Sequence, residues 1–454
     1  MSFHLGKPIL VMMIIALIAG AVVAMRPAQQ KADLTVWVFA DSHYKAYLPL
    51  IPEFEKQHNV KVNLNILNAR ALAVRLTSMF MSGEPSDEAP DMVEMEIGLM
   101  GRFFRPPIKD IGFMPLNDRL QESGLYDRIV QTRFAPWSKE GVIFGVPHDL
   151  HPCVIVYRDD LFREAGVDLT TAKTWPQYHE ACLKFRDYWV GRGFKTRHAL
   201  ELPESSSDYL QVMLLQRGIN PIDGYGNIHL EDPRTAATLA FYAQLVAGKK
   251  KVTQQSSQGI GAFTRDLTEG SLCSFIAPDW RVTYIKRYGA AVTGKMRMMP
   301  MPVFEPTDSP TSTWGGTMMG FPRSCKNPDL AWKLMEFLYF SEEGMKQRRE
   351  STEILPPIKP MWADPFYHQA DPYFGGQKAS ELYIELAPKI PPRYVSFASP
   401  VATLALNEAL IRATAYVEEH GDHVDQQELE ANCRKWLADS AADLRTRMDQ
   451  WRFD

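Results

Sequence analysis

The chain has 454 residues, a formal net charge of −4, and charges of both signs mixed along its length. A chain of this length predicts about two or three domains, and an apolar content of 45% is enough to bury a large core. No basic stripe interleaved with aromatic residues occurs, so nucleic acid is excluded as a partner. The five cysteines form no CxxC pair and lack the histidine spacing of a zinc site. Because their number is odd, at least one must be a free thiol, and one disulfide remains possible.

An uncharged apolar run spans residues 8–25, between Lys7 and Arg26. As a helix it would measure about 27 Å, slightly less than the hydrocarbon core of a bilayer. We therefore expect residues 1–26 to be either a signal peptide cleaved after Ala24 or an N-terminal membrane anchor that is retained. In both cases the rest of the chain is expected in the periplasm or another extracytoplasmic space.

From residue 34 onward, patterns typical of strands and helices alternate. Strands are predicted at 34–40, 60–66 and 92–97, and helices at 41–54 and 71–81. This order predicts a parallel α/β sheet, in which ligands bind beyond the carboxyl ends of the strands. The polar and aromatic residues near those ends are Trp37, Phe39, Asp41, Ser42, Glu94 and Glu96.

The stretch from residue 145 to 178 divides the chain. A turn signal at Gly145 and Pro147 is followed by a short β-branched run, 153–157, which predicts a buried strand. A short helix is predicted after it, and a longer one begins at Thr174, which is followed by a proline in the first turn. A buried strand that leaves one α/β unit and enters another is typical of a crossover between two lobes.

The second half of the chain repeats the alternation. A strand at 271–276 ends at Asp279 and Trp280, and a glycine-rich turn, 314–316, follows a return strand. Helices are predicted to begin after Asn327 and at Ser341.

These segments, in this order, resemble the extracellular solute-binding proteins of bacterial ABC transporters, most closely their sugar-binding, maltose-binding-protein-like group. The resemblance spans residues 34–362 and implies a two-lobed type II periplasmic-binding-protein fold with a hinge. Lobe 1 is expected at 33–152 plus about 285–350, and lobe 2 at about 153–284 plus about 351–454. It further implies a monomer without cofactor or metal, which binds a carbohydrate between the lobes and delivers it to a membrane permease.

Sugars present apolar faces and many hydroxyls, so flat aromatic rings and hydrogen-bonding side chains are expected around them. Aromatic candidates for stacking are Trp37, Phe39, Trp280 and Trp314. Candidates for polar contacts are Asp41, Ser42, Glu94, Glu96, Asp149, Asp208, Tyr209 and Asp279, with Gly315 allowing close approach of the backbone. Several of these residues have a structural explanation too, because Trp37 and Phe39 could pack in the core and Asp41 could cap a helix.

Three alternatives remain open at this point. A secreted glycoside hydrolase needs two carboxylates that flank one bond, and Glu94 with Glu96 would have to supply them. A metal site would draw on His148 and His151 or on residues 420–423, but each group lacks a convincing third ligand. The chain could also bind another small polar solute, such as a polyamine or a peptide.

Overall fold

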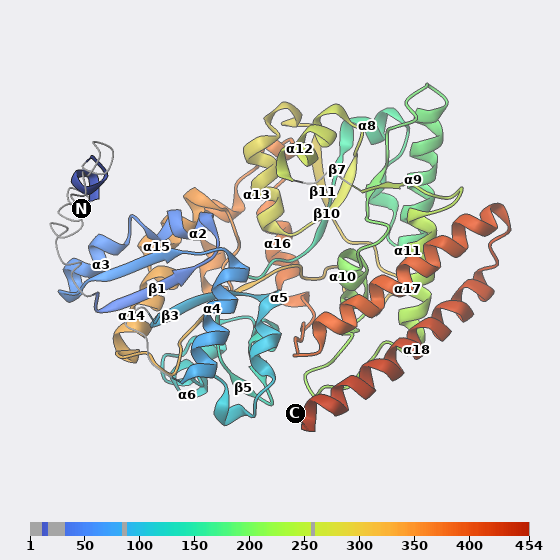
Figure 1. Ribbon diagram of the computed structural model, residues 1–454. Helices are drawn as coiled ribbons and strands as arrows, with labels where there is room; N and C mark the ends of the chain where they lie inside the picture. Colours follow the sequence, from blue (N-terminus) through green and yellow to red (C-terminus); the bar gives the residue numbers. More distant parts are fainter. Residues whose placement is uncertain (1–10, 17–31, 84–88, 256–258, 454) are drawn as a thin grey trace, which may run out of the picture.

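The computed structural model describes residues 11–16, 32–83, 89–255 and 259–453. Within these ranges the chain forms two α/β halves, each with its own central sheet (Figure 1). The first sheet has five strands in the order β2-β1-β3-β12-β6. Their bounds are β1 Leu34–Val38, β2 Val62–Ile66, β3 Met92–Glu96, β6 Val146–Pro147 and β12 Thr317–Gly320. As expected, β1 pairs in parallel with β2 and β3, whereas β12 runs antiparallel to β3 and β6.

The main helices of the first half are α2 Asp41–Tyr47, α3 Ile51–His58, α4 Ala69–Ser82, α14 Pro328–Phe340 and α15 Glu342–Ser351. The last two begin after the predicted caps Asn327 and Ser341, whereas α2 has no side-chain cap. The single helix expected over 41–54 is wrong, because the chain turns at residues 48–50 and starts again at α3. Pro52 lies in the first turn of α3, where its missing N–H breaks no hydrogen bond, whereas a continuous helix would need that donor.

The second half is organised around β7 Val154–Arg158, all of whose residues are buried. β10 Ser274–Ala277 and β11 Met296–Pro300 pair antiparallel with its two edges. The long helices beside this sheet are α9 Trp175–Val190, α11 Pro233–Val246, α17 Ser399–His420 and α18 Gln426–Phe453. The last three pack on one another and extend to the right in Figure 1.

The strand pairing changes one expected lobe boundary. The sequence predicts that about 285–350 lie together in lobe 1, but β11 pairs with β7, with Met299 opposite Ile155. Residues 296–300 therefore belong to the second sheet, and the return to the first half comes later, before β12. The short apolar run of β11 shows no preference for either sheet, so only its long-range pairing decides the matter.

Several chain segments connect the two halves. The segments around residues 147–153 and 312–318 run antiparallel, with the His148 N–H donating to the Thr317 carbonyl over 2.9 Å and the Cys153 N–H donating to the Ser312 carbonyl over 3.0 Å. A further connection follows α15, where the Leu355 N–H donates to Asp279 Oδ2 over 3.0 Å. Side-by-side connections of this kind suit a hinge.

The apolar run at 8–25 lies mostly outside the described residues, which include residues 11–16 of it as helix. In the ranges that the structure covers, no helix combines the length and apolarity needed to cross a bilayer. All five cysteines are free thiols, with four of them buried and Cys325 partly buried, so the disulfide left open by the sequence does not form.

Candidate functional site

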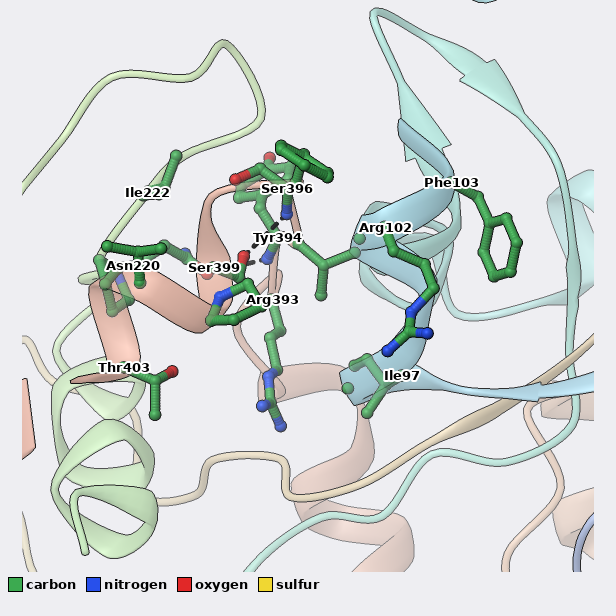
Figure 2. Close-up of a pocket in the computed structure, with 18 of the residues that line it drawn as sticks. Ile97, Arg102, Phe103, Asn220, Ile222, Arg393, Tyr394, Ser396, Ser399 and Thr403 are labelled. Atoms are coloured by element: carbon green, nitrogen blue, oxygen red, sulfur yellow. Dashed lines mark hydrogen bonds between the residues drawn. The ribbon is translucent and has the colours of Figure 1, made fainter. Parts of the chain in front are cut away.

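A cavity of about 1030 Å³ lies between the two halves. Its first wall comes from α4, from α5 Ile97–Met100 and from the 3-10 turn η1 Gly101–Phe104. Its second wall comes from α10 Asp208–Gln216, from the start of α17 and from residues 393–397. Figure 2 shows Ile97 and Arg102 on one side, Asn220 and Thr403 on the other, and Arg393 between them.

The lining combines aromatic rings with hydrogen-bonding and charged groups. Aromatic and polar members are Thr77, Phe80, Arg102, Phe103, Arg105, Asp110, Asp208, Gln211, Asn220, Thr313, Trp314, Arg393, Tyr394, Ser396, Phe397, Ser399, Thr403 and Trp451. Of the residues singled out from the sequence, Asp208 and Trp314 line this cavity. Such a mixture can stack on flat apolar faces and exchange hydrogen bonds with hydroxyls.

Glu96 lies at the edge of the cavity, next to Ile97 and Gly98, which line it. Its carboxylate caps α5 by accepting a hydrogen bond from the Gly98 N–H over 2.8 Å. Burial raises the pKa of Glu96, although this hydrogen bond and the charge of Arg393 act in the opposite direction. Glu96 therefore has a structural role as a cap, and its charge faces the cavity arginine.

Trp314 lines the cavity and packs against two further aromatic rings that lie behind it. The ring of Trp314 lies 4.7 Å from that of Tyr209 and 5.8 Å from that of Trp280, measured between centroids. The Trp280 indole N–H donates to the Trp314 carbonyl over 3.1 Å. Gly315 has φ +84, and a Cβ there would lie 3.2 Å from Trp280 Nε1, so glycine allows this turn to pack against the indole.

Tyr209 is only 7% exposed, and its hydroxyl is hydrogen-bonded within the second half. Its hydroxyl donates to Glu201 over 2.6 Å and accepts from the Arg281 guanidinium over 2.8 Å. The tyrosine hydroxyl is thus occupied within the second half, and Tyr209 supports Trp314 through its ring.

Asp149 and Asp279 do not line the cavity but meet in the connection between the halves. His151 lies between them, with Nε2 3.1 Å from Asp149 and Nδ1 2.5 Å from Asp279, and Arg133 donates to Asp149 over 2.9 Å. Burial alone would lower the pKa of His151, but the two carboxylates outweigh it and raise the pKa to about 9. The protonated imidazole therefore donates to both carboxylates, and these residues join the halves.

Glu94 is fully buried in the first half, away from the cavity. It accepts hydrogen bonds from the Tyr47 and Tyr339 hydroxyls over 2.6 and 2.8 Å, and its second oxygen contacts His43 Nδ1 at 2.8 Å. Burial favours the neutral form, yet the facing imidazole keeps the pKa of Glu94 below its ordinary value. Glu94 is therefore a buried structural residue, and the expectation that it contacts the ligand is wrong.

The remaining residues near the end of β1 are also placed differently from the expectation. Trp37 packs in the core with an exposed fraction of 8%, and Phe39 is partly buried against the same cluster. Asp41 is exposed and forms an ion pair with Lys45 at 2.6 Å, and Ser42 is half-buried on α2. None of these four residues lines the cavity, so the expectation that they contact the ligand is wrong.

One group of possible metal ligands occurs in the described part of the chain, formed by His43, Glu94 and His148. Burial, together with the Arg348 guanidinium, lowers the pKa of His148 to about 3, so this imidazole is neutral. The three ligand atoms lie within 4.8 Å of one another, but Glu94 already has three hydrogen-bonding partners. A zinc ion would have to replace these hydrogen bonds with ligand bonds of about 2.0–2.2 Å, so the arrangement fits a buried hydrogen-bond network better than a metal site.

Sequence reasoning missed the segment 390–397, Ile-Pro-Pro-Arg-Tyr-Val-Ser-Phe, which lines the cavity with Arg393, Tyr394 and Phe397. It lies between helices and has no periodicity. The signal that could have found it is the concentration of prolines, aromatic residues and an arginine outside any regular element, which is typical of a binding loop.

Known proteins that resemble this chain belong to one family of binding proteins. The family model described as bacterial extracellular solute-binding protein matches residues 50–374. The arabinooligosaccharide-binding protein of Bacillus subtilis is 24% identical over 350 residues, which cover 75% of this chain and 76% of that protein. A second arabinooligosaccharide-binding protein, from Halalkalibacterium halodurans, is 21% identical over 414 residues, 89% of this chain and 90% of its own.

Solved structures share the fold at low identity. The sugar-binding protein MalE from Xanthomonas citri superposes with a TM-score of 0.70 at 17% identity, covering 92% of this chain and 99% of that one. An ABC transporter associated binding protein from B. animalis subsp. lactis, in complex with beta-1,6-galactobiose, gives 0.63 at 18% identity over 90% and 97% of the two chains. The predicted periplasmic-binding-protein fold is confirmed, and with the family model matching most of its length the chain belongs to the bacterial extracellular solute-binding proteins.

Proposed function

We propose that this protein is the substrate-binding component of an ABC importer and that it binds an oligosaccharide in the cavity between its halves. The observation that supports this most is the cavity itself, which has about 1030 Å³ and is lined from both halves by aromatic and hydrogen-bonding side chains. Small-molecule sites usually measure about 300–1,000 Å³. A cavity at the upper end of that range suits several linked sugar units better than one.

The relatives support the same ligand class. The two curated relatives are named for binding arabinooligosaccharides, and the similar solved structures include one with beta-1,6-galactobiose and one with maltotetraose. Membership of a solute-binding family also makes this chain a binding protein rather than an enzyme. The hydrolase alternative fails on geometry as well, because Glu94 is fully buried and cannot flank a glycosidic bond together with Glu96.

In the proposed mechanism, the two halves act as lobes that close on the ligand. Lobe 1 comprises about 33–152 and 312–351, lobe 2 comprises about 153–311 and 352–453, and the antiparallel connections at 147–153 and 312–318 form the hinge. Closure would exclude water from the cavity, and the closed monomer would dock on the permease outside the cytoplasm. The N-terminal segment is either cleaved or holds the protein at the membrane.

The charges around the cavity argue against a polyamine. Arg102, Arg105 and Arg393 all line it, and their positive charges would repel a polycation. Two acids, Asp110 and Asp208, also line the cavity, so the lining is mixed rather than uniformly acidic.

A panel of ligands tests the proposal. We expect thermal unfolding of the protein to shift upward with arabino-oligosaccharides, maltodextrins or galacto-oligosaccharides, and calorimetric titration to give one site per chain. Spermidine and a tetrapeptide serve as the rival ligands. A shift with spermidine or the peptide, and with none of the saccharides, would contradict the proposal.

A further inference from the structure

Arg393 is a positive charge in the middle of the cavity, supplied by the loop before α17. Figure 2 shows its side chain extending from the loop into the space between the two walls. In the part of the chain that the structure describes, no hydrogen bond or ion pair joins its guanidinium to any residue. Its donors are therefore directed at the cavity and available to a ligand.

The energetics of this arginine are unusual. Arg393 is half-buried, and this burial lowers the pKa of its guanidinium, so its charge is only partly solvated. The carboxylates of Glu96 and Asp208 act on it through space, but Glu96 is engaged with the Gly98 N–H. A partly desolvated cation is costly unless an anion with good geometry approaches it.

We propose that the cavity recognises saccharides that carry a carboxylate, such as a uronic acid residue, and that Arg393 binds this carboxylate; this inference rests on the proposed function. A guanidinium offers two parallel N–H donors that match the two oxygens of a carboxylate. Trp314 would stack on the neutral sugar units, while Arg102 and Arg105 add positive potential along the same lining. The acidic sugar thus sits beside Arg393, and the remaining units extend along the cavity.

Two ligand pairs that differ only in whether C6 is a carboxylate or an alcohol test this proposal by calorimetric titration. The first is trigalacturonate against α-1,4-linked galactotriose, and the second is glucuronosyl-xylotriose against the same compound with its carboxyl group reduced to the alcohol. We expect the acidic member of at least one pair to bind about tenfold or more tightly, because hydrogen bonds to charged groups are stronger than neutral ones. Equal or tighter binding of the neutral member in both pairs would overturn the proposal.

Variants locate the recognition. We expect Arg393→Gln to abolish the preference for the acidic member, with a loss of about tenfold to a hundredfold in its affinity and little change for the neutral one. Arg393→Lys keeps the charge without the paired donors and should retain part of the preference. The matched control is Arg412→Gln, which removes one positive charge from an exposed position on α17 and should leave both affinities unchanged.

Two failures are distinguishable. If neutral oligosaccharides bind and Arg393→Gln weakens acidic and neutral members equally, the carboxylate inference fails while the proposed function stands. If no saccharide of either kind binds, the proposed function itself fails, and the inference fails with it. Thermal unfolding of each variant shows whether the fold is kept, which is expected because Arg393 holds no described residue in place.

Discussion

The ion pairs of His151 predict a specific dependence of stability on pH. His151 donates to Asp149 and Asp279, which come from opposite sides of the hinge, and its pKa is about 9 in the folded protein against an ordinary value of 6.5. A pKa raised by folding contributes stability that is fully present below pH 6.5 and is lost as the pH rises through 9. The free energy of unfolding should therefore fall by about 1.4 kcal/mol per pH unit in that window, or about 3 kcal/mol in all.

The substitution His151→Asn isolates this contribution. His151 has φ +55, and asparagine is among the residues that tolerate this backbone conformation, so the turn should be kept. The assay is urea unfolding followed by circular dichroism, from pH 6.5 to pH 9. We expect the difference in unfolding free energy between the natural protein and the variant to shrink steadily over this range, because the variant has no imidazole to lose a proton.

His148→Asn is the matched control. The pKa of His148 is lowered to about 3 by burial and by Arg348, so this imidazole stays neutral throughout the window. The control variant should therefore be less stable but should keep the fall in stability that deprotonation of His151 causes, because His148 contributes only a small rise near pH 6.5, where it titrates in the unfolded chain. Ionisation of cysteines in the unfolded chain affects all variants alike and cancels in the differences. A difference between the natural protein and His151→Asn that stays constant from pH 6.5 to pH 9 would refute the reasoning.

Three further predictions concern the site and the fold. Trp314→Ala should weaken oligosaccharide binding by about 2 kcal/mol, roughly thirtyfold. Trp37→Phe should leave the affinity unchanged, because Trp37 packs in the core. A calorimetric titration in which Trp37→Phe weakens binding and Trp314→Ala does not would contradict the site. Gly316→Ala should lower the free energy of unfolding by about 1–3 kcal/mol, since Gly316 has φ +150 and a Cβ would lie 2.5 Å from Arg133 Nη2; an unchanged melting temperature would contradict this. Thr174→Ala should cost about 1 kcal/mol by removing the N-cap of α9, and Thr174→Ser should restore most of it; equal stability of all three proteins in urea would contradict the role of the cap.

The local signals in the sequence predicted much of the fold. Thr174, Asn327 and Ser341 each accept a hydrogen bond from the first turn of the helix that was expected to follow. These caps act over three residues, so the sequence alone reveals them. The second sheet was harder, because β11 could have joined either half until its pairing with β7 was known.

The cavity was predicted less well, for a physical reason. Glu94 and Glu96 share one face of β3, but Glu94 is satisfied by Tyr47 and Tyr339, of which the latter is 245 residues away in the chain. Arg393 comes from an irregular loop that approaches α5 only in the folded chain. Partners this distant leave no periodic pattern, so sequence reasoning found the residue types without finding their neighbours.

Hydrogen exchange with and without an oligosaccharide tests the central claim most directly, because it reports the binding site along the whole backbone. The saccharide should be the one from the neutral panel that binds most tightly. We predict slower amide exchange in both walls of the cavity at once, at residues 97–106 of the first half and at 208–222 and 393–404 of the second. Protection confined to one half, or protection around His43 and His148 with none in the two walls, would contradict an oligosaccharide site between the halves.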